Sequence, residues 1–268
     1  MEYCLTAEEV LYLAAVGGAD TFYGVRDTLS GLTDRELRLK VVEMENSLGA
    51  KGYLEEDFDG NRSVLKELSE VIERCGGCER FLCFERKEIG GEQKAYMYFM
   101  GGNAAYKMAC GKDQYTFSAI GLPEIRKDVE RGLAFQETEK KEEGSFQIPY
   151  GELEKAVTLA RRGSPEKGVE LLKEAGASDS AAQAVMNGAL HKADFYALLF
   201  MDLREEREPG YSLHCLSGDG LTVIEYGADG EDDQDHVRFL TVDEGELKER
   251  LRAGFEKIDC LVEEETFS

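Results

Sequence analysis

Two cysteines close together in the chain are the residues best suited to chemistry. Cys75 and Cys78 are separated by two glycines in the stretch IERCGGCERFLCFE, a spacing shared by redox dithiols and by halves of zinc sites. A reactive dithiol needs its nucleophile at a helix N-terminus, where the helix dipole stabilises the thiolate. Here the helical pattern SVLKELSEVIER precedes the cysteines, and we expect that orientation to raise the thiol pKa. The sequence therefore favours a structural role, in which Gly76 and Gly77 end the helix.

A zinc site is not favoured by the remaining cysteines. A structural zinc ion needs four ligands, which commonly come as two closely spaced pairs. Of the seven cysteines, Cys4, Cys110, Cys215 and Cys260 are isolated from such pairs. We therefore predict no metal site, and the scattered, odd number of cysteines is typical of free thiols.

The other chemical signals are weak. The three histidines, His191, His214 and His236, match no motif for a nucleophile or a metal. The acidic tract ADGEDDQDH lacks the spacing of an EF-hand and is interpreted as a solvated hairpin tip, and GGNAA lacks the features of a phosphate-binding loop. We expect no catalytic, cofactor-binding or metal-binding residues, no cofactor and no enzymatic activity. The many carboxylates leave an acid and base pair open as an alternative.

The composition restricts the partners. The 268 residues include 55 acidic and 32 basic side chains, giving a formal charge of -23, which repels phosphate backbones and anionic membranes. The first residues, MEYCLTAEEV, do not resemble a signal peptide, and no apolar run reaches spanning length. The sequence predicts a cytoplasmic protein that binds no nucleic acid and does not insert into membranes. Hydrophobic residues make up 42% of the chain, enough for a sizeable core.

The first half of the chain changes from a helical to a strand period. Thr6 with Glu9, and Thr33 with Glu36, have the spacing of capping boxes at the start of two helices. The second helix is predicted to bury Leu37, Val41, Met44 and Leu48. A third helical pattern ends at Cys75, and strands are predicted at residues 80–89, 93–100, 104–110 and 114–120, with glycine-containing turns between them. Helical spacing returns at residues 122–135.

The second half repeats this order. Helices are predicted at residues 149–163, 164–176 and 178–190, strands at 194–204, 211–217, 220–227 and 236–242, and a last helix at 243–258. We therefore predict an α+β fold with two pseudo-symmetric halves, residues 1–138 and 146–268. Each half consists of helices, a mostly antiparallel four-stranded meander and a closing helix. We expect the halves to form one integrated domain around a central sheet.

Two segments are candidates for binding a partner. The first is the alanine-rich helix at residues 178–190, whose small residues allow close approach of another helix; its larger apolar positions are Val185, Met186, Ala189 and Leu190. Packing within its own half is the alternative. The second is a charged hairpin with two glycines at its tip, formed by Glu88, Ile89, Gly90, Gly91 and Glu92. A plain solvent turn is the alternative there.

The order of elements resembles the EspG-type chaperones of type VII (ESX) secretion. The stretches that carry the resemblance are LTAEEVLYL, SLGAKGYL, YMYFMGGNAAYKMACGKDQYTFSAI, FQIPYGELEKAV and LLKEAGASDSAAQAV, which together span most of the chain. The resemblance implies two pseudo-symmetric α+β halves around a central sheet. It also implies a cytosolic protein with no enzymatic activity and no cofactor.

The resemblance further implies an export chaperone. Such a protein binds the helical tip of secreted helix-hairpin substrates, here WXG100-like or LXG-like proteins, and we expect a monomer or weak homodimer. By position, the substrate contacts correspond to the hairpin at residues 88–92 and the helices at residues 164–190. The many Lys and Glu residues, the seven cysteines and the scarcity of proline suit a divergent Gram-positive, Firmicutes-type member.

Two other functions stay open at this stage. One is a carboxylate-dependent hydrolase with a groove between the halves, and the other is an immunity or scaffold protein whose acidic surface binds a basic partner. A deep pocket with two inward carboxylates of raised pKa would favour the hydrolase. A shallow apolar face beside a projecting hairpin would favour the chaperone.

Overall fold

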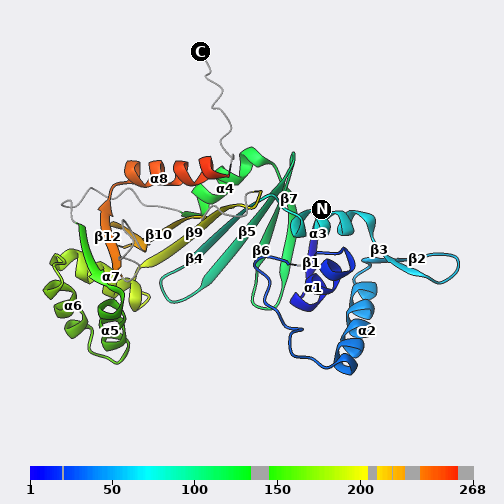
Figure 1. Cartoon of the computed structure of the whole chain (residues 1–268), viewed down its shortest axis with the longest axis horizontal. Coiled ribbons are helices and arrows are strands. Elements are labelled where there is room, and N and C mark those ends of the chain that lie inside the picture. The colour runs from blue at the N-terminus through cyan, green and yellow to red at the C-terminus, as the bar shows by residue number, and fades with distance from the viewer. Residues whose placement is uncertain (20, 134–144, 205–209, 219, 227–235, 259–268) are drawn as a thin grey trace, which may run out of the picture. The chain divides into compact units, whose positions relative to one another are not determined.

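The computed structural model describes residues 1–19, 21–133, 145–204, 210–218, 220–226 and 236–258 (Figure 1). The chain is α+β, as predicted, with ten described strands in one large sheet. Every strand pair of described register is antiparallel. Three parts of the sequence lie outside the described residues: residues 228–235 of the acidic tract, the polar residues 136–144, and Cys260. His236, the last residue of the acidic tract, is described.

The chain divides into two compact units. Unit 1 consists of Met1–Cys83, Ala95–Ile125 and Asp202–Glu208, and unit 2 of Phe84–Lys94, Arg126–Met201 and Pro209–Ser268. Four elements contribute residues to both units: β4 (Arg80–Lys87), β5 (Gln93–Gly101), α4 (Leu122–Leu133) and, through its last residue Asp202, β9 (Asp194–Asp202).

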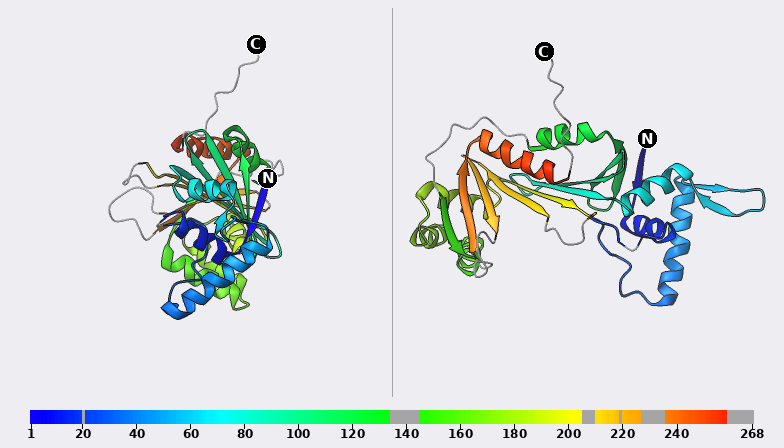
Figure 2. Two further views of the ribbon diagram at one scale, coloured as in Figure 1. Left: turned by 90° about the vertical axis from the view of Figure 1, so that its right-hand side faces the viewer. Right: turned by 45° about the horizontal axis from the view of Figure 1, so that its top comes forward.

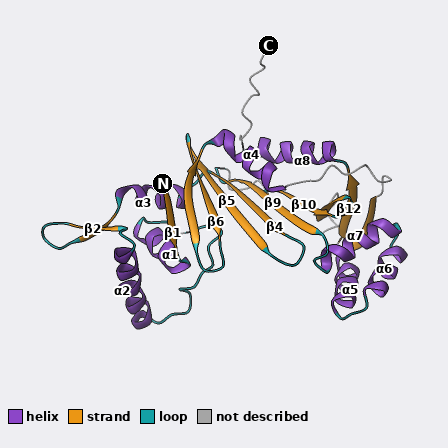
Figure 3. Ribbon diagram, turned by 180° about the vertical axis from the view of Figure 1, so that it is seen from behind, coloured by secondary structure: helices purple, strands orange, loops and turns teal. Residues whose placement is uncertain are grey.

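Unit 1 combines three helices with one end of the sheet. Its further elements are β1 (Glu2–Leu5), α1 (Ala7–Val16), α2 (Asp34–Ala50), β2 (Leu54–Glu56), β3 (Arg62–Val64), α3 (Lys66–Gly76), β6 (Ala104–Cys110) and β7 (Tyr115–Ile120). The strand order is β1-β7-β6-β5. Strands β2 and β3 form a separate hairpin that extends away from α2 and α3 (Figure 3). The sequence analysis missed β1, β2 and β3.

Both predicted capping boxes are present in unit 1. At the start of α1, the Thr6 amide donates to Glu9 Oε2 over 2.7 Å, and the Glu9 amide donates to Thr6 Oγ1 over 3.2 Å. Thr33 and Glu36 make the same reciprocal bonds at the start of α2. These bonds satisfy backbone donors that the first helical turn leaves unpaired. Local spacing in the sequence was therefore sufficient to locate both helix starts.

The predicted burial of α2 is only half right. Met44 and Leu48 are buried, but Leu37 is 40% exposed and Val41 is only partly covered. Residues 34–39 are all exposed, so the first turns of this helix contribute little to the core. The apolar period identified the helix correctly, but it does not reveal how far the supporting elements extend.

Unit 2 contains the other end of the sheet and a group of three helices. Its further elements are β8 (Ser145–Pro149), α5 (Tyr150–Arg161), α6 (Pro165–Glu174), α7 (Asp179–Ala189), β9 (Asp194–Asp202), β10 (Tyr211–Ser217), β11 (Leu221–Tyr226), β12 (His236–Val242) and α8 (Glu244–Lys257). The strand order is β9-β10-β11-β12-β8. All of these elements except β8 were predicted, most within two residues of their observed ends.

Helices cover both faces of the strands in unit 2. A Cβ atom placed on Gly188 of α7 would lie 2.4 Å from Leu216 Cδ2, and one on Gly254 of α8 would lie 2.6 Å from Phe200 Cε2. Leu216 pairs with Phe195 in the sheet, so it points to the face opposite that of Phe200. Helices α7 and α8 therefore pack on opposite faces, which Figure 2 shows for the yellow-green and orange-red helices.

The two strand meanders follow the same order. Strands β4 to β7 are followed by α4, and strands β9 to β12 are followed by α8. In each set an additional strand pairs with the last strand of the meander: β1 with β7, and β8 with β12. The division into halves at residues 138 and 146 and the pseudo-symmetry stay predictions.

Candidate partner-binding site

The predicted hairpin at residues 88–92 is formed between β4 and β5. The Glu88 amide donates to the Glu92 carbonyl over 2.8 Å, and the Gly91 amide donates to the Glu88 carbonyl over 2.9 Å. Gly90 and Gly91 have φ angles of +91° and +93°, which L side chains rarely adopt. Ile89 is 63% exposed at the tip. The hairpin therefore presents one apolar side chain to solvent.

The predicted helix at residues 178–190 is present as α7, but its apolar residues face inward. Val185 is 5% exposed and Met186 is fully buried in a core that includes Leu172. Ala189 and Leu190 are partly buried against the same core. Val185 and Met186 therefore pack inside the protein, which was the alternative interpretation. These two residues are not part of the proposed partner surface. Most of their neighbours in the helix are small residues, so the sequence did not reveal which face of the helix is buried.

The structure brings the two predicted segments together. The Ile89 amide donates to Asp194 Oδ1 over 2.9 Å, although the two residues are 105 positions apart. The Gly90 amide donates to the carbonyl of His191 over 3.3 Å. His191 and Asp194 belong to the short connection between α7 and β9 and to the start of that strand. The hairpin tip therefore lies beside the C-terminal end of α7.

Charged side chains of both signs pair around the base of the hairpin. Arg86 Nη2 lies 2.9 Å from Asp194 Oδ2, and Lys94 Nζ lies 2.9 Å from Glu88 Oε1. The hydrogen bond from Lys94, with the charge of Arg86, lowers the pKa of the Glu88 carboxyl. Glu88 is therefore ionised at neutral pH, and its charge is balanced locally.

His191 has a cationic neighbour. Its Nε2 atom lies 3.2 Å from Lys87 Nζ. Partial desolvation and the nearby charges of Lys87 and Arg161 lower the pKa of His191 below its ordinary value. The ring is therefore neutral at physiological pH, and it lies within hydrogen-bonding distance of Lys87 at the base of the hairpin.

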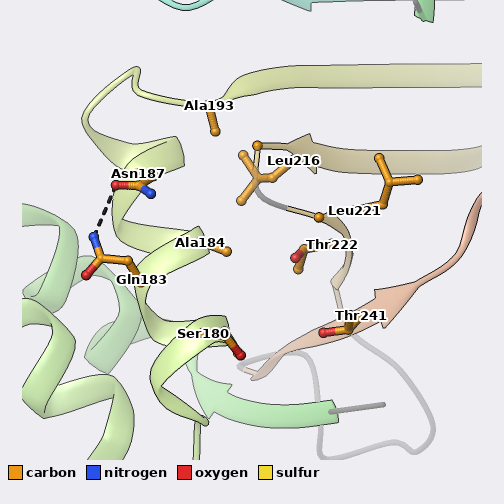
Figure 4. Close-up of a pocket in the computed structure, with 12 residues that line it drawn as sticks. Ser180, Gln183, Ala184, Asn187, Ala193, Leu216, Leu221, Thr222 and Thr241 are labelled. Carbon is orange, nitrogen blue, oxygen red and sulfur yellow. Dashed lines mark hydrogen bonds between the residues drawn. The ribbon is translucent and has the colours of Figure 1, made fainter. Parts of the chain in front are cut away.

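Residues of α7 contribute to the lining of two hollows. The first, of about 140 Å³, is lined mainly by Ala184, Asn187, Ala193, Leu216, Leu221 and Thr241. The side chains of Ala184 and Leu216 point toward the space between α7 and the strands (Figure 4). Gln183 Nε2 donates to Asn187 Oδ1 over 3.1 Å on the outer side of the helix. This hollow is small, with apolar walls and a polar rim.

The second hollow adjoins the hairpin. It has a volume of about 290 Å³ and is lined by Glu85, Arg86, Lys87, Gln93, Gly188, His191 and Phe195. Its rim carries charged side chains of both signs, and Phe195 is the one aromatic residue in its lining. Among the described carboxyls with a resolved shift, every pKa is lowered: those of Asp27, Glu36, Asp57, Glu88 and Asp202.

The Cys75 and Cys78 thiols are placed as the sequence predicts. Helix α3 ends at Gly76, directly after Cys75, and Gly77 is its C-cap residue. Both cysteines are buried and free. Burial raises the pKa of Cys75 well above its ordinary value and that of Cys78 to about 11. The expected direction of the pKa shift is thus confirmed.

Alkylation kinetics should show this burial directly. We expect Cys75 and Cys78 to resist iodoacetamide in the native protein at pH 8, and the Cys78 reaction to accelerate as pH approaches about 11. Partly exposed Cys4 is the internal reference, and the rates are measured by peptide mass spectrometry. Faster labelling of Cys78 than of Cys4 would contradict this assignment.

The remaining chemical candidates occupy structural positions. His214 lies in β10, stacked on Phe195 and edge-on to Tyr226, and burial lowers the pKa of its ring. The described residues contain no group of three or more His, Cys, Asp or Glu side chains arranged to hold a metal ion. Nor does any described helix have the length and apolar character needed to cross a bilayer.

The fold is that of an EspG-type chaperone. The structure is similar to that of the Mycobacterium tuberculosis type VII secretion system chaperone EspG5, solved in complex with the PE25-PPE41 dimer. The TM-score is 0.58, the match covers 98% of each chain, and the sequences are 11% identical. No protein-family model and no curated protein matches the sequence. The predicted EspG-like fold is therefore confirmed by the structure. With 11% sequence identity, this similarity establishes the fold alone.

Proposed function

We propose that this protein is a cytosolic export chaperone of a type VII secretion system, which binds a secreted protein and keeps it soluble. The observation that carries the proposal is the EspG-like fold, which extends over 98% of the chain. The second support is local: an exposed Ile89 at the tip of a hairpin held beside α7. EspG5 was solved in complex with the PE25-PPE41 dimer, and we extend that kind of partnership to this chain.

We further propose that the client presents the tip of a helical hairpin, as WXG100-like or LXG-like proteins do. Such a tip exposes apolar side chains to water, and covering them contributes about 25 cal/mol for each Å² of apolar surface removed. The client must later be released to the export machinery. An interface toward the lower end of about 1,200–2,000 Å² in total would allow that release.

The proposed partner surface consists of the 88–92 hairpin and the C-terminal end of α7. Its hairpin residues are Glu88, Ile89, Gly90, Gly91 and Glu92, and its helix residues are Ala189 and Leu190. Ile89 supplies the exposed apolar contact, while the ionised Glu88 is already paired with Lys94 at the base of the hairpin.

Replacing Ile89 with aspartate tests this function. Helix-hairpin proteins encoded beside the gene would be co-expressed with the chaperone, and complex formation would be measured by size exclusion and calorimetry. We expect Ile89→Asp to weaken binding at least about tenfold, since exposed apolar residues at the centre of an interface contribute most of its affinity.

Phe58→Asp is the matched control. Phe58 is fully exposed at the tip of the β2–β3 hairpin in unit 1, outside the proposed surface. We expect this variant to bind like the wild-type protein. The proposal fails if no neighbouring helix-hairpin protein forms a complex, or if both variants lose binding equally.

A further inference from the structure

Asp194, the first residue of β9, has a carboxylate that connects three parts of unit 2. Its Oδ1 atom accepts the Ile89 amide over 2.9 Å. Its Oδ2 atom pairs with Arg86 Nη2 over 2.9 Å and accepts the Tyr196 hydroxyl over 3.2 Å. The side chain is 19% exposed, so the pairing takes place largely away from bulk solvent. A single carboxylate thus joins the hairpin tip and the hairpin base to a strand that is distant in sequence.

The tip of the hairpin lies beyond the paired strands β4 and β5, which end at Lys87 and begin again at Gln93. Its internal bonds close the turn between Glu88 and Glu92 but do not orient it toward α7. Two adjacent glycines at the tip leave the unbound backbone unusually free. Outside its own turn, the tip backbone is held by the short Asp194 bond to Ile89 and by the longer bond, 3.3 Å, from Gly90 to His191.

Arg86 extends the connection toward α4. Its Nη1 atom donates to the Gly132 carbonyl over 3.3 Å, and its guanidinium carbon lies 5.5 Å from the centre of the Tyr196 ring. A charge-assisted hydrogen bond in a partly buried setting is stronger than one at the surface. The Asp194 carboxylate is therefore itself held in place by groups that do not belong to the hairpin tip.

We propose that Asp194 is the positioning residue that sets the orientation of the 88–92 hairpin, and with it the place where Ile89 meets a partner. The residue acts through the hairpin and makes no partner contact of its own. Holding a binding loop in one orientation lowers the entropy lost on association, which improves affinity. The effect on partner binding rests on the proposed function; the effect on the hairpin does not.

Amide hydrogen exchange of Ile89, measured by NMR, tests the positioning role without any partner. We expect Asp194→Ala to speed exchange of this amide at least about tenfold, since the acceptor is lost. Asp194→Asn keeps an acceptor oxygen but loses the charge that pairs with Arg86, so its effect should be smaller. Because the Asn variant preserves the size of the side chain, it keeps the test informative if the Ala variant does not fold.

Asp202→Asn is the matched control. Asp202 is the last residue of the same strand, and its carboxylate pairs with Arg204 instead of with the hairpin. We expect unchanged Ile89 exchange in this variant. Unchanged exchange in both Asp194 variants would overturn the proposal, as would an equal rise in Asp202→Asn.

Client binding is measured with the same variants and the co-expressed helix-hairpin proteins. Faster exchange together with weaker binding supports both the positioning role and the proposed function. Faster exchange with no client bound by any variant supports the positioning role and contradicts the proposed function. Weaker binding with unchanged exchange contradicts the positioning role alone.

Discussion

Met186→Ala should lower the free energy of unfolding by about 2–5 kcal/mol, the range for removing a long apolar side chain from a close-packed core. Met186 is fully buried, and a Cβ atom on Gly168 of α6 would lie only 2.8 Å from its sulfur. Helices α6 and α7 are thus already in close contact, so the cavity that the substitution creates cannot easily collapse. Urea unfolding followed by circular dichroism measures the change.

Gln183→Ala is the control on the same helix. Gln183 is exposed, and its side chain bonds only to Asn187 one turn later in the described structure. We expect a change within about 0.5 kcal/mol, as is usual for surface positions. Similar losses in the two variants would mean that α7 is turned differently, and Val185 and Met186 would then return as partner-binding candidates.

Lys51→Met should lower the free energy of unfolding by about 3 kcal/mol. Lys51 Nζ lies 2.6 Å from Glu9 Oε2, and the Glu9 side chain is only 2% exposed. Removing the lysine leaves a buried carboxylate without its cation, which costs about 3–5 kcal/mol in fully buried pairs. Lys51 is itself 28% exposed, so we expect the lower end of that range. Thermal and urea unfolding would both report the loss.

Lys40→Met provides the comparison. Lys40 pairs with Glu8 and Glu43 while 38% of its side chain is exposed. Exposed ion pairs contribute at most about 1 kcal/mol, so this variant should be nearly as stable as the wild type. The double variant Glu9→Gln with Lys51→Met should recover part of the lost stability, because no charge is then buried. Equal losses for Lys51→Met and Lys40→Met would contradict the assigned importance of the buried pair.

Local sequence patterns predicted those features of the fold that depend on neighbouring residues. The Thr6 and Thr33 capping boxes and the end of α3 at Gly76 require only contacts within a few positions. The missed strands have three to five residues, and two of them, β1 and β8, pair with strands that are distant in the sequence, as when Tyr3 of β1 pairs with Phe117 of β7. So short a segment shows too little alternation to be identified by its period.

In the candidate site too, features that depend on neighbouring residues were predicted and features that depend on distant residues were not. The two glycines predicted the hairpin, because a tight turn with positive φ requires them. The roles of Asp194 and Arg86 could not be predicted from the sequence, since charged residues at strand ends are common and their spatial neighbours were not known. The inward orientation of Val185 was also undetermined, because alanines at positions 181, 182, 184 and 189 make several faces of α7 equally apolar.

The left-handed backbone of Gly90 and Gly91 also limits how this protein could diversify. A side chain at either position would cost about 1–2 kcal/mol in backbone strain, so a mutation there would distort the hairpin. Ile89 and the flanking Glu88 and Glu92 carry no such penalty. Among paralogues that bind different partners, sequence variation should therefore concentrate at these three positions around an invariant pair of glycines.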